Sequence, residues 1–153
     1  MNLFGVLDIS ASALMAERQR AEVVTSNLAN AESAGANPSR VYRRREVVFA
    51  THAVPFSQAL DAAGELAPSA DPLGDAGAPG VAVSAVVTDQ TPLVRRYEPG
   101  SANADAQGYV TYPNINPAQE MTDLMEAVRS YQLNISAAQA TKGMIQQSLS
   151  LLK

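Results

Sequence analysis

The sequence predicts a mainly α-helical protein with a small β region, in which long helices from the two chain ends pair as a coiled coil. Apolar residues recur at helical spacing near both ends, β-branched residues gather in the middle, and an Ala-, Gly- and Pro-rich stretch interrupts that middle. We therefore expect a helical coiled-coil domain built from residues 1–35 and 114–153. Residues 36–113 are expected to form a β-rich domain with a flexible insertion at 57–80.

The first helix is predicted over residues 6–34, because no Gly or Pro interrupts that range. Phe4, Leu7, Leu14 and Leu28 belong to a set of apolar positions spaced three or four residues apart, which is typical of one helix face. Gly35 and the proline that follows it are expected to end the helix.

The middle of the chain has the composition of short strands. Val41–Tyr42 and Val47–Phe49 flank an arginine cluster, and residues 81–87 are rich in β-branched side chains. Tyr97 and Tyr109–Tyr112 continue the pattern, separated by Gly- and Pro-containing turn signals. A small sheet or a set of hairpins is expected between the two terminal helices.

The last helix has the stronger pattern. Asn116 is a suitable N-cap and Pro117 suits the first helical position, so the helix is predicted to begin there and to be roughly 50 Å long. Apolar residues outside the heptad positions, such as Met125 and Leu133, imply more than one neighbouring helix. The heptad positions a and d are Met121, Leu124, Val128, Tyr131, Ile135, Ala138, Lys142, Ile145, Leu149 and Leu152, of which only Lys142 is charged.

Composition excludes several functions. The 153 residues include no cysteine and one histidine, His52, which leaves no disulfide, thiolate metal site, His cluster or Ser-His-Asp triad within one subunit. The net charge of −4 argues against a general nucleic-acid binder. No phosphate-binding loop or nucleophile motif appears, so we predict no enzyme, no cofactor, no metal and no small-molecule substrate. No apolar run is long enough for a membrane span and no basic leader precedes one, which by itself predicts a cytosolic protein.

A resemblance changes that last expectation. The motif Ser26-Asn27-Leu28-Ala29-Asn30 at the end of the first helix resembles the signature of bacterial flagellar axial proteins, the rod and hook family. Within that family the layout is similar to the C-type proximal rod proteins, and the similarity covers nearly all of the chain except residues 57–80. The matching stretches are Tyr42–Phe49, Gly80–Val83, Tyr97–Gly100, Gly108–Asn116 and the last helix.

The resemblance implies a structural subunit of the proximal rod, the drive shaft that transmits torque for motility. It implies partners that are copies of this chain and other rod subunits in a helical assembly, with the export apparatus as a partner in transit. It also implies a place in the periplasmic rod, reached by type III export without a cleaved signal peptide. Two alternatives are another axial protein, of the B-type rod or hook-like kind, and a soluble helical adaptor that binds a partner helix.

Each set of residues proposed for assembly also has an interpretation that involves this chain alone. Asn27 and Asn30 either cap the first helix or bond the backbone of an adjacent subunit. The arginine cluster is either a solvated strand or pairs with a neighbour's carboxylates. The predicted subunit interface comprises Leu14, Asn27, Leu28, Asn30, Arg43, Arg44, Arg45, Met121, Leu124, Val128, Tyr131, Ile135, Ile145 and Leu149.

Overall fold

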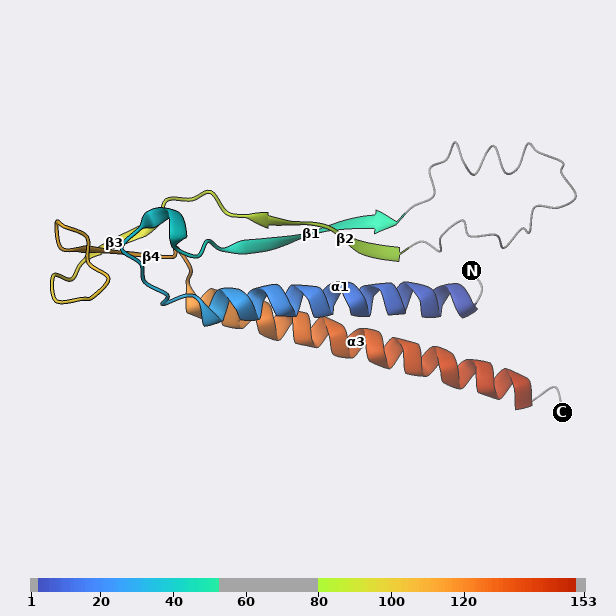
Figure 1. Cartoon of the computed structure of the whole chain (residues 1–153). Helices are drawn as coiled ribbons and strands as arrows, with labels where there is room; N and C mark the ends of the chain where they lie inside the picture. Colours follow the sequence, from blue (N-terminus) through green and yellow to red (C-terminus); the bar gives the residue numbers. More distant parts are fainter. Residues whose placement is uncertain (1–2, 53–79, 151–153) are drawn as a thin grey trace, which may run out of the picture.

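The computed structural model describes residues 3–52 and 80–150, and it confirms the predicted fold class. Two long helices, α1 (Leu3–Ala29) and α3 (Pro117–Ser150), run antiparallel along each other (Figure 1). A two-stranded ribbon of β1 (Arg45–His52) and β2 (Gly80–Thr88) lies along the other side of α1, so α1 is packed between the ribbon and α3.

A second strand pair, β3 (Val94–Tyr97) and β4 (Tyr109–Tyr112), lies at the end of the molecule where α1 stops and α3 starts (Figure 1). Both strand pairs are antiparallel. In the longer ribbon the register runs from Arg45 opposite Thr88 to His52 opposite Gly80, with one irregularity between Val48 and Phe49. The strands predicted around residues 47–49, 81–87, 97 and 109–112 are therefore confirmed.

The prediction of strand at Val41–Tyr42 is wrong. The chain there follows a short 3-10 helix, η1 (Pro38–Arg40), and β1 begins only at Arg45. The Asn37 side chain caps η1 by accepting a hydrogen bond from the Ser39 backbone N–H at 3.0 Å. This turn brings the tyrosine back against the end of α1, where its hydroxyl is used as described below.

Helix α1 ends five residues before the predicted limit. The Asn30 side chain donates a hydrogen bond to the Ser26 carbonyl at 2.8 Å, and the Asn30 backbone N–H donates to the same carbonyl at 3.2 Å. These bonds satisfy a carbonyl of the last helical turn. Gly35 instead pairs with Thr111 of β4 through two backbone hydrogen bonds, which attaches the chain after α1 to the β3–β4 hairpin.

Helix α3 begins where the sequence predicts. The Asn116 side chain accepts a hydrogen bond from the Ala118 backbone N–H at 3.1 Å, and Pro117 is the first helical residue. Both features are favourable at a helix start, because the first backbone N–H groups have no partner within the helix.

The surface that α3 buries within the chain is not the predicted heptad set. Glu120, Ala127 and Thr141 are its buried residues, whereas Met121 and Val128 keep 53% and 44% of their surface exposed. The buried core in the described ranges is small and formed by short side chains, including Ala16, Val24, Ala31, Val110 and Ala127. Burial of such residues contributes little area, so most large apolar side chains of α3 are left for other contacts.

The predicted insertion at 57–80 lies outside the described residues except for Gly80, which starts β2, and Leu152 also lies outside them. In the described part of the chain, neither helix combines the length and the apolar content that crossing a bilayer requires.

Candidate functional site

The Asn27 side chain is buried where α1, β1 and α3 meet, with 0% of its surface exposed. Its amide nitrogen donates to the Arg45 carbonyl at 2.8 Å and to a Glu120 carboxylate oxygen at 3.0 Å. Its amide oxygen accepts from the Tyr42 hydroxyl at 2.9 Å and from the Arg45 backbone N–H at 3.0 Å. All four hydrogen-bonding positions of this amide are thus used within one chain.

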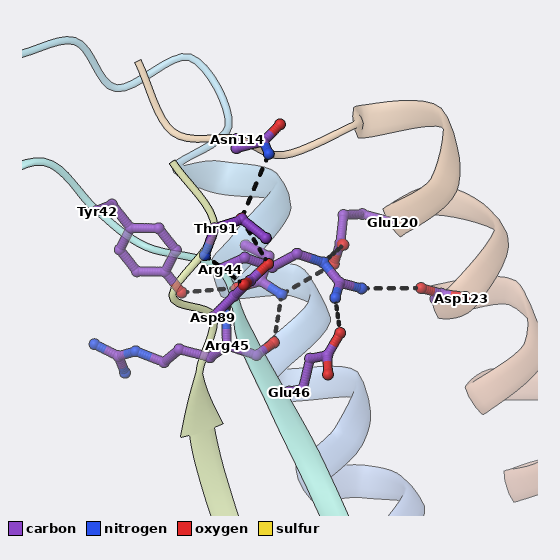
Figure 2. A network of polar contacts seen from close by, with 10 residues as sticks. Tyr42, Arg44, Arg45, Glu46, Asp89, Thr91, Asn114, Glu120 and Asp123 are labelled. Atoms are coloured by element: carbon purple, nitrogen blue, oxygen red, sulfur yellow. Dashed lines mark hydrogen bonds and ion pairs between the residues drawn. The ribbon is translucent and has the colours of Figure 1, made fainter. Parts of the chain in front are cut away.

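Glu120 continues this network on α3 and is only 1% exposed. Its other carboxylate oxygen accepts a hydrogen bond from Arg44 Nε at 2.6 Å. Figure 2 shows Arg44 between three acidic side chains: it also forms ion pairs with Glu46 and, at 3.6 Å, with Asp123. We call Asn27, Tyr42, Arg44, Glu46, Glu120 and Asp123, together with the Arg45 backbone, the polar junction.

The charge of Arg44 is stabilised inside this junction. Partial burial acts to lower its pKa, but the hydrogen bond to Glu120 and the negative charges of Glu120 and Glu46 outweigh that effect. The net result is a raised pKa, so Arg44 stays protonated and the buried carboxylate keeps its counter-charge. A buried carboxylate with an arginine partner and an amide donor meets the condition under which burial of charge is tolerated.

The other two arginines of the cluster have different partners. Arg43 donates to the backbone carbonyls of Asp89 and Thr91, at 3.4 and 3.1 Å. Arg45 is exposed, and its guanidinium lies over the Tyr42 ring, 5.3 Å from the ring centre. Hydrogen bonds from the backbone and side chain of Thr91 lower the pKa of Asp89. The Asp89 backbone N–H donates to the Arg44 carbonyl at 2.8 Å, which holds the loop after β2 beside the junction (Figure 2).

Sequence reasoning selected Asn27, Arg44 and Arg45 but missed Tyr42, Glu46, Glu120 and Asp123 as site residues. Asn27 and Glu120 are separated by 93 residues, and no spacing rule connects them. The only sequence signal for Glu120 was weak, because an acidic residue in the first turn of α3 is already explained by its favourable interaction with the helix dipole. The Asn30 side chain makes the intrachain bond that the capping interpretation expects, and its role between subunits stays a prediction.

A second polar cluster links the two helices further along. Arg20 of α1 pairs with Glu126 of α3 at 3.3 Å and with Glu17 at 3.8 Å. Oxygen Oε2 of Glu17 is buried, and among the described residues no donor forms a hydrogen bond with it. Burial raises the pKa of Glu17, which Arg20 offsets only in part, while the charge of Glu126 raises it further.

The second candidate surface consists of the large apolar side chains that α3 leaves exposed. Met121, Met125, Val128, Leu133 and Met144 expose between 44% and 66% of their surface. Among the predicted interface residues, Tyr131 and Leu149 are also exposed at 36% and 60%. The remaining apolar ones are half-buried, namely Leu14, Leu28, Leu124, Ile135 and Ile145. We call the exposed residues Met121, Met125, Val128, Tyr131, Leu133, Met144 and Leu149 the α3 apolar face.

Two protein families match this chain, one at each end. Residues 7–36, which span most of α1 and the turn after it, match the family described as flagella basal body rod protein. Residues 106–151, which span β4 and α3, match the family described as flagellar basal body rod FlgEFG protein C-terminal. Both matches define the class as that of flagellar basal-body rod proteins.

Curated relatives cover the whole chain. The flagellar basal-body rod protein FlgC of Bacillus subtilis is 39% identical over 100% of both chains. FlgC of Escherichia coli O157:H7 is 38% identical over 99% of this chain and 98% of the relative, and FlgC of Borreliella burgdorferi is 30% identical over 100% and 99%. The chain therefore belongs to the FlgC family of flagellar basal-body rod proteins. It is a structural subunit of the basal-body rod, in assembly with other rod subunits.

Proposed function

We propose that this chain serves in the proximal rod as one of the subunits of the shaft that transmits torque for motility. The observation that carries the proposal is the α3 apolar face, which the fold of one chain leaves uncovered. Exposed apolar area of this extent on a long helix favours contact with neighbouring helices. A shaft must resist twisting, and many such helix contacts acting together provide stiffness.

We propose two separate roles for the residues that the sequence singled out. The apolar side chains of α3, from Met121 to Leu149, together with Leu14 and Leu28, pack against neighbouring subunits. Asn27 and Arg44 act within the chain, because their polar groups already have internal partners. Arg45 keeps an exposed guanidinium and is the member of the arginine cluster best suited to a contact between subunits.

The finer points of location and chemistry are part of the same proposal. We propose that the chain reaches the periplasm through the flagellar type III export path without a cleaved signal peptide, with the export apparatus as a transient partner. We further propose a purely structural role without catalysis, because helix packing and internal ion pairs account for the polar groups of the junction. The terminal helices, 1–35 and 114–153, would then form the assembly domain, with 36–113 as a middle domain that lies along it.

Substitution of Val128 by Asp tests the proposal. Val128 is exposed in the single chain, so purified Val128→Asp should keep its helix content and melting temperature. In the rod the new carboxylate would lose its water without gaining a partner of opposite charge, at a cost of several kcal/mol. Cells that carry this variant should therefore lack hooks and swim no better than a deletion strain. The measurements are circular dichroism of the protein, motility plates, and electron microscopy of basal bodies.

Two neighbouring positions serve as controls. Ser136→Asp changes an exposed polar residue of α3 outside the α3 apolar face and should leave motility unchanged. Ala127→Asp, at a position with 1% exposure, should disrupt the isolated chain itself. Normal swimming of Val128→Asp cells would contradict the proposed interface.

A further inference from the structure

The Asn27 side chain contacts β1 in the way that a residue of a neighbouring strand would. Its amide nitrogen donates to the Arg45 carbonyl at 2.8 Å, and its amide oxygen accepts from the Arg45 backbone N–H at 3.0 Å. Residues that lie opposite each other in antiparallel strands exchange the same two hydrogen bonds. Since Thr88 of β2 is the strand partner of Arg45, the buried amide of Asn27 occupies the place of a third strand beside β1.

A second side chain of α1 contacts the opposite end of the ribbon. The Val81 backbone N–H donates to the Ser12 hydroxyl at 3.2 Å. Ser12 and Asn27 are fifteen residues apart on α1, which is about 22 Å along the helix axis. From Val81 to Thr88, the partner of Arg45, β2 advances seven residues, which is about 23 Å along a strand. The two contacts on α1 therefore match the two ends of the ribbon, which lies along the helix between them (Figure 1).

The space between these two contacts is incompletely packed. A cavity of about 320 Å³ lies between residues 12–19 of α1 and Gly80–Val83 of β2. Another, of about 220 Å³, lies between residues 20–24 of α1 and the first three residues of β1. Because protein interiors are otherwise packed with few voids, apolar contact alone restrains the ribbon on α1 only loosely. The directional hydrogen bonds at its two ends are the stronger restraint.

The contact at Asn27 is stronger than the contact at Ser12. In the described part of the chain, the Asn27 amide makes two hydrogen bonds to one residue of β1, whereas the Ser12 hydroxyl accepts a single one from β2. Tyr42 donates to the amide oxygen and Glu120 accepts from the amide nitrogen, so the Asn27 amide has one orientation. In that orientation its donor and acceptor face the C=O and N–H of Arg45. The start of the ribbon is thus fixed more firmly than its far end.

We propose that Asn27 is the positioning residue of the β1–β2 ribbon: its amide fixes where the ribbon begins on α1, while Ser12 aligns the far end. A side-chain amide suits this place because it presents a donor and an acceptor side by side. The ribbon carries exposed apolar side chains, including Val86 and Val87. Since Glu120 of α3 binds the same amide, Asn27 also sets where these side chains lie relative to the α3 apolar face.

Two variants separate the contact of Asn27 with the ribbon from its contact with α3. Glu120→Gln keeps an acceptor for the Asn27 amide but removes the charged partner of Arg44, so it weakens only the α3 side. In the double exchange, Asn27→Asp with Glu120→Gln, the new amide can donate to the new carboxylate, which restores the bond to α3 without adding charge. The Arg45 carbonyl, however, then faces a carboxylate that cannot donate.

Hydrogen exchange of the purified full chain measures both sides. In the double exchange, amides of residues 46–48 and 85–88 should exchange about tenfold faster than in Glu120→Gln, because the Arg45 carbonyl has lost its donor. The α3 amides should exchange at equal rates in the two variants. Glu120→Gln by itself should leave the ribbon amides as in the wild type. Ser12→Ala should accelerate exchange only at the far end of the ribbon, in residues 81–83.

Two results would overturn the assignment to Asn27. One is ribbon amides that exchange equally in Glu120→Gln and in the double exchange. The other is a ribbon that loosens in Glu120→Gln alone, because α3 rather than Asn27 would then be what holds it.

The consequence for assembly rests on the proposed function, and it is tested in cells from which the native copy is deleted. The double exchange should give about tenfold fewer hook-bearing basal bodies than Glu120→Gln, and Ser12→Ala should give a smaller reduction relative to the wild type. Equal numbers in the first pair together with normal numbers in Ser12→Ala would overturn the link to assembly. The deletion strain tests the proposed function by itself, because it should build no rod. A motile deletion strain would refute the function whatever the variants do.

Discussion

Glu120 joins α3 to the rest of the chain, because its carboxylate binds Asn27 of α1 and Arg44, the residue before β1. Glu120→Ala should lower the free energy of unfolding by about 3 kcal/mol, since it leaves the Asn27 amide and the Arg44 guanidinium without their buried partner. Urea unfolding of the purified protein, followed by circular dichroism, measures the change.

Glu126→Ala is the control for that prediction. Glu126 also pairs with an arginine across the two helices, but its side chain is 63% exposed. Exposed ion pairs contribute little, so the loss should stay below about 1 kcal/mol. Equal losses in the two variants would mean that burial of Glu120 does not set its contribution.

The raised pKa of Glu17 predicts a stability that decreases as the pH rises, which is opposite to the effect of a carboxyl group whose pKa is lowered on folding. Burial raises its pKa in the folded chain above the unfolded value of about 4.3, so the folded state binds the proton more tightly. Stability should therefore fall as pH rises from the unfolded pKa through the folded pKa, and the ionised carboxylate then weakens the fold at neutral pH. Glu17→Gln should raise the stability at pH 7 by about 1 kcal/mol.

The gain from Glu17→Gln should disappear as the pH approaches 4, because the wild-type carboxyl is then protonated as well. Thermal melts at several pH values measure this. A gain that stays constant with pH would show that ionisation of Glu17 is not its cause.

At the scale of elements, the β3–β4 hairpin depends on one glycine. Gly108 has a φ of +83°, and a Cβ there would lie 2.9 Å from Cε2 of Tyr97, on a ring that packs edge-on against Tyr109. Gly108→Ala should therefore destabilise the hairpin by about 1–2 kcal/mol, through the left-handed backbone and the displaced ring. Gly100→Ala is the matched control, because none of the described residues has an atom within 4 Å of the added methyl group, apart from its chain neighbours.

Hydrogen exchange of the β4 amides measures that hairpin directly. Tyrosine fluorescence during denaturation, to which Tyr97, Tyr109 and Tyr112 of the hairpin contribute, is a second measure. Gly108→Ala should lose protection at Val110 while α1 and α3 are unchanged. Equal behaviour of the two alanine variants would contradict the role given to the left-handed turn.

The helices show how far the sequence predicts the elements. Capping by Asn116 and Pro117 was readable, because it depends on neighbouring residues alone. The contact surface of α3 was not, because the heptad rule assumes that large apolar residues face the partner within the chain. Within this chain Glu120, Ala127 and Thr141 face α1 instead, one position before Met121 and Val128. The exposed apolar residues are the ones that we propose for contacts outside the single chain.

At the scale of the whole molecule, the fold class followed from periodicity and the family from motifs in order along the chain. The polar junction did not follow from either. Asn27 and Arg44 were selected from the sequence, but their partner Glu120 lies far away in sequence. A single amino-acid sequence gives no signal that such distant residues pair. The early end of α1 was missed for a related reason, since Asn30 caps the helix while the residues after it still have helical composition.

The separation of 93 residues between Asn27 and Glu120 has a consequence for the time course of folding. A chain emerges from the ribosome with its N-terminus first, so α1 appears long before the partner that completes its buried amide network. Contacts of such high sequence separation form slowly, because the entropy of closing a long loop is lost before the contact is gained. The nascent chain thus remains without its closing contact until the last third has appeared, and completion of the native structure is deferred to the end of its emergence.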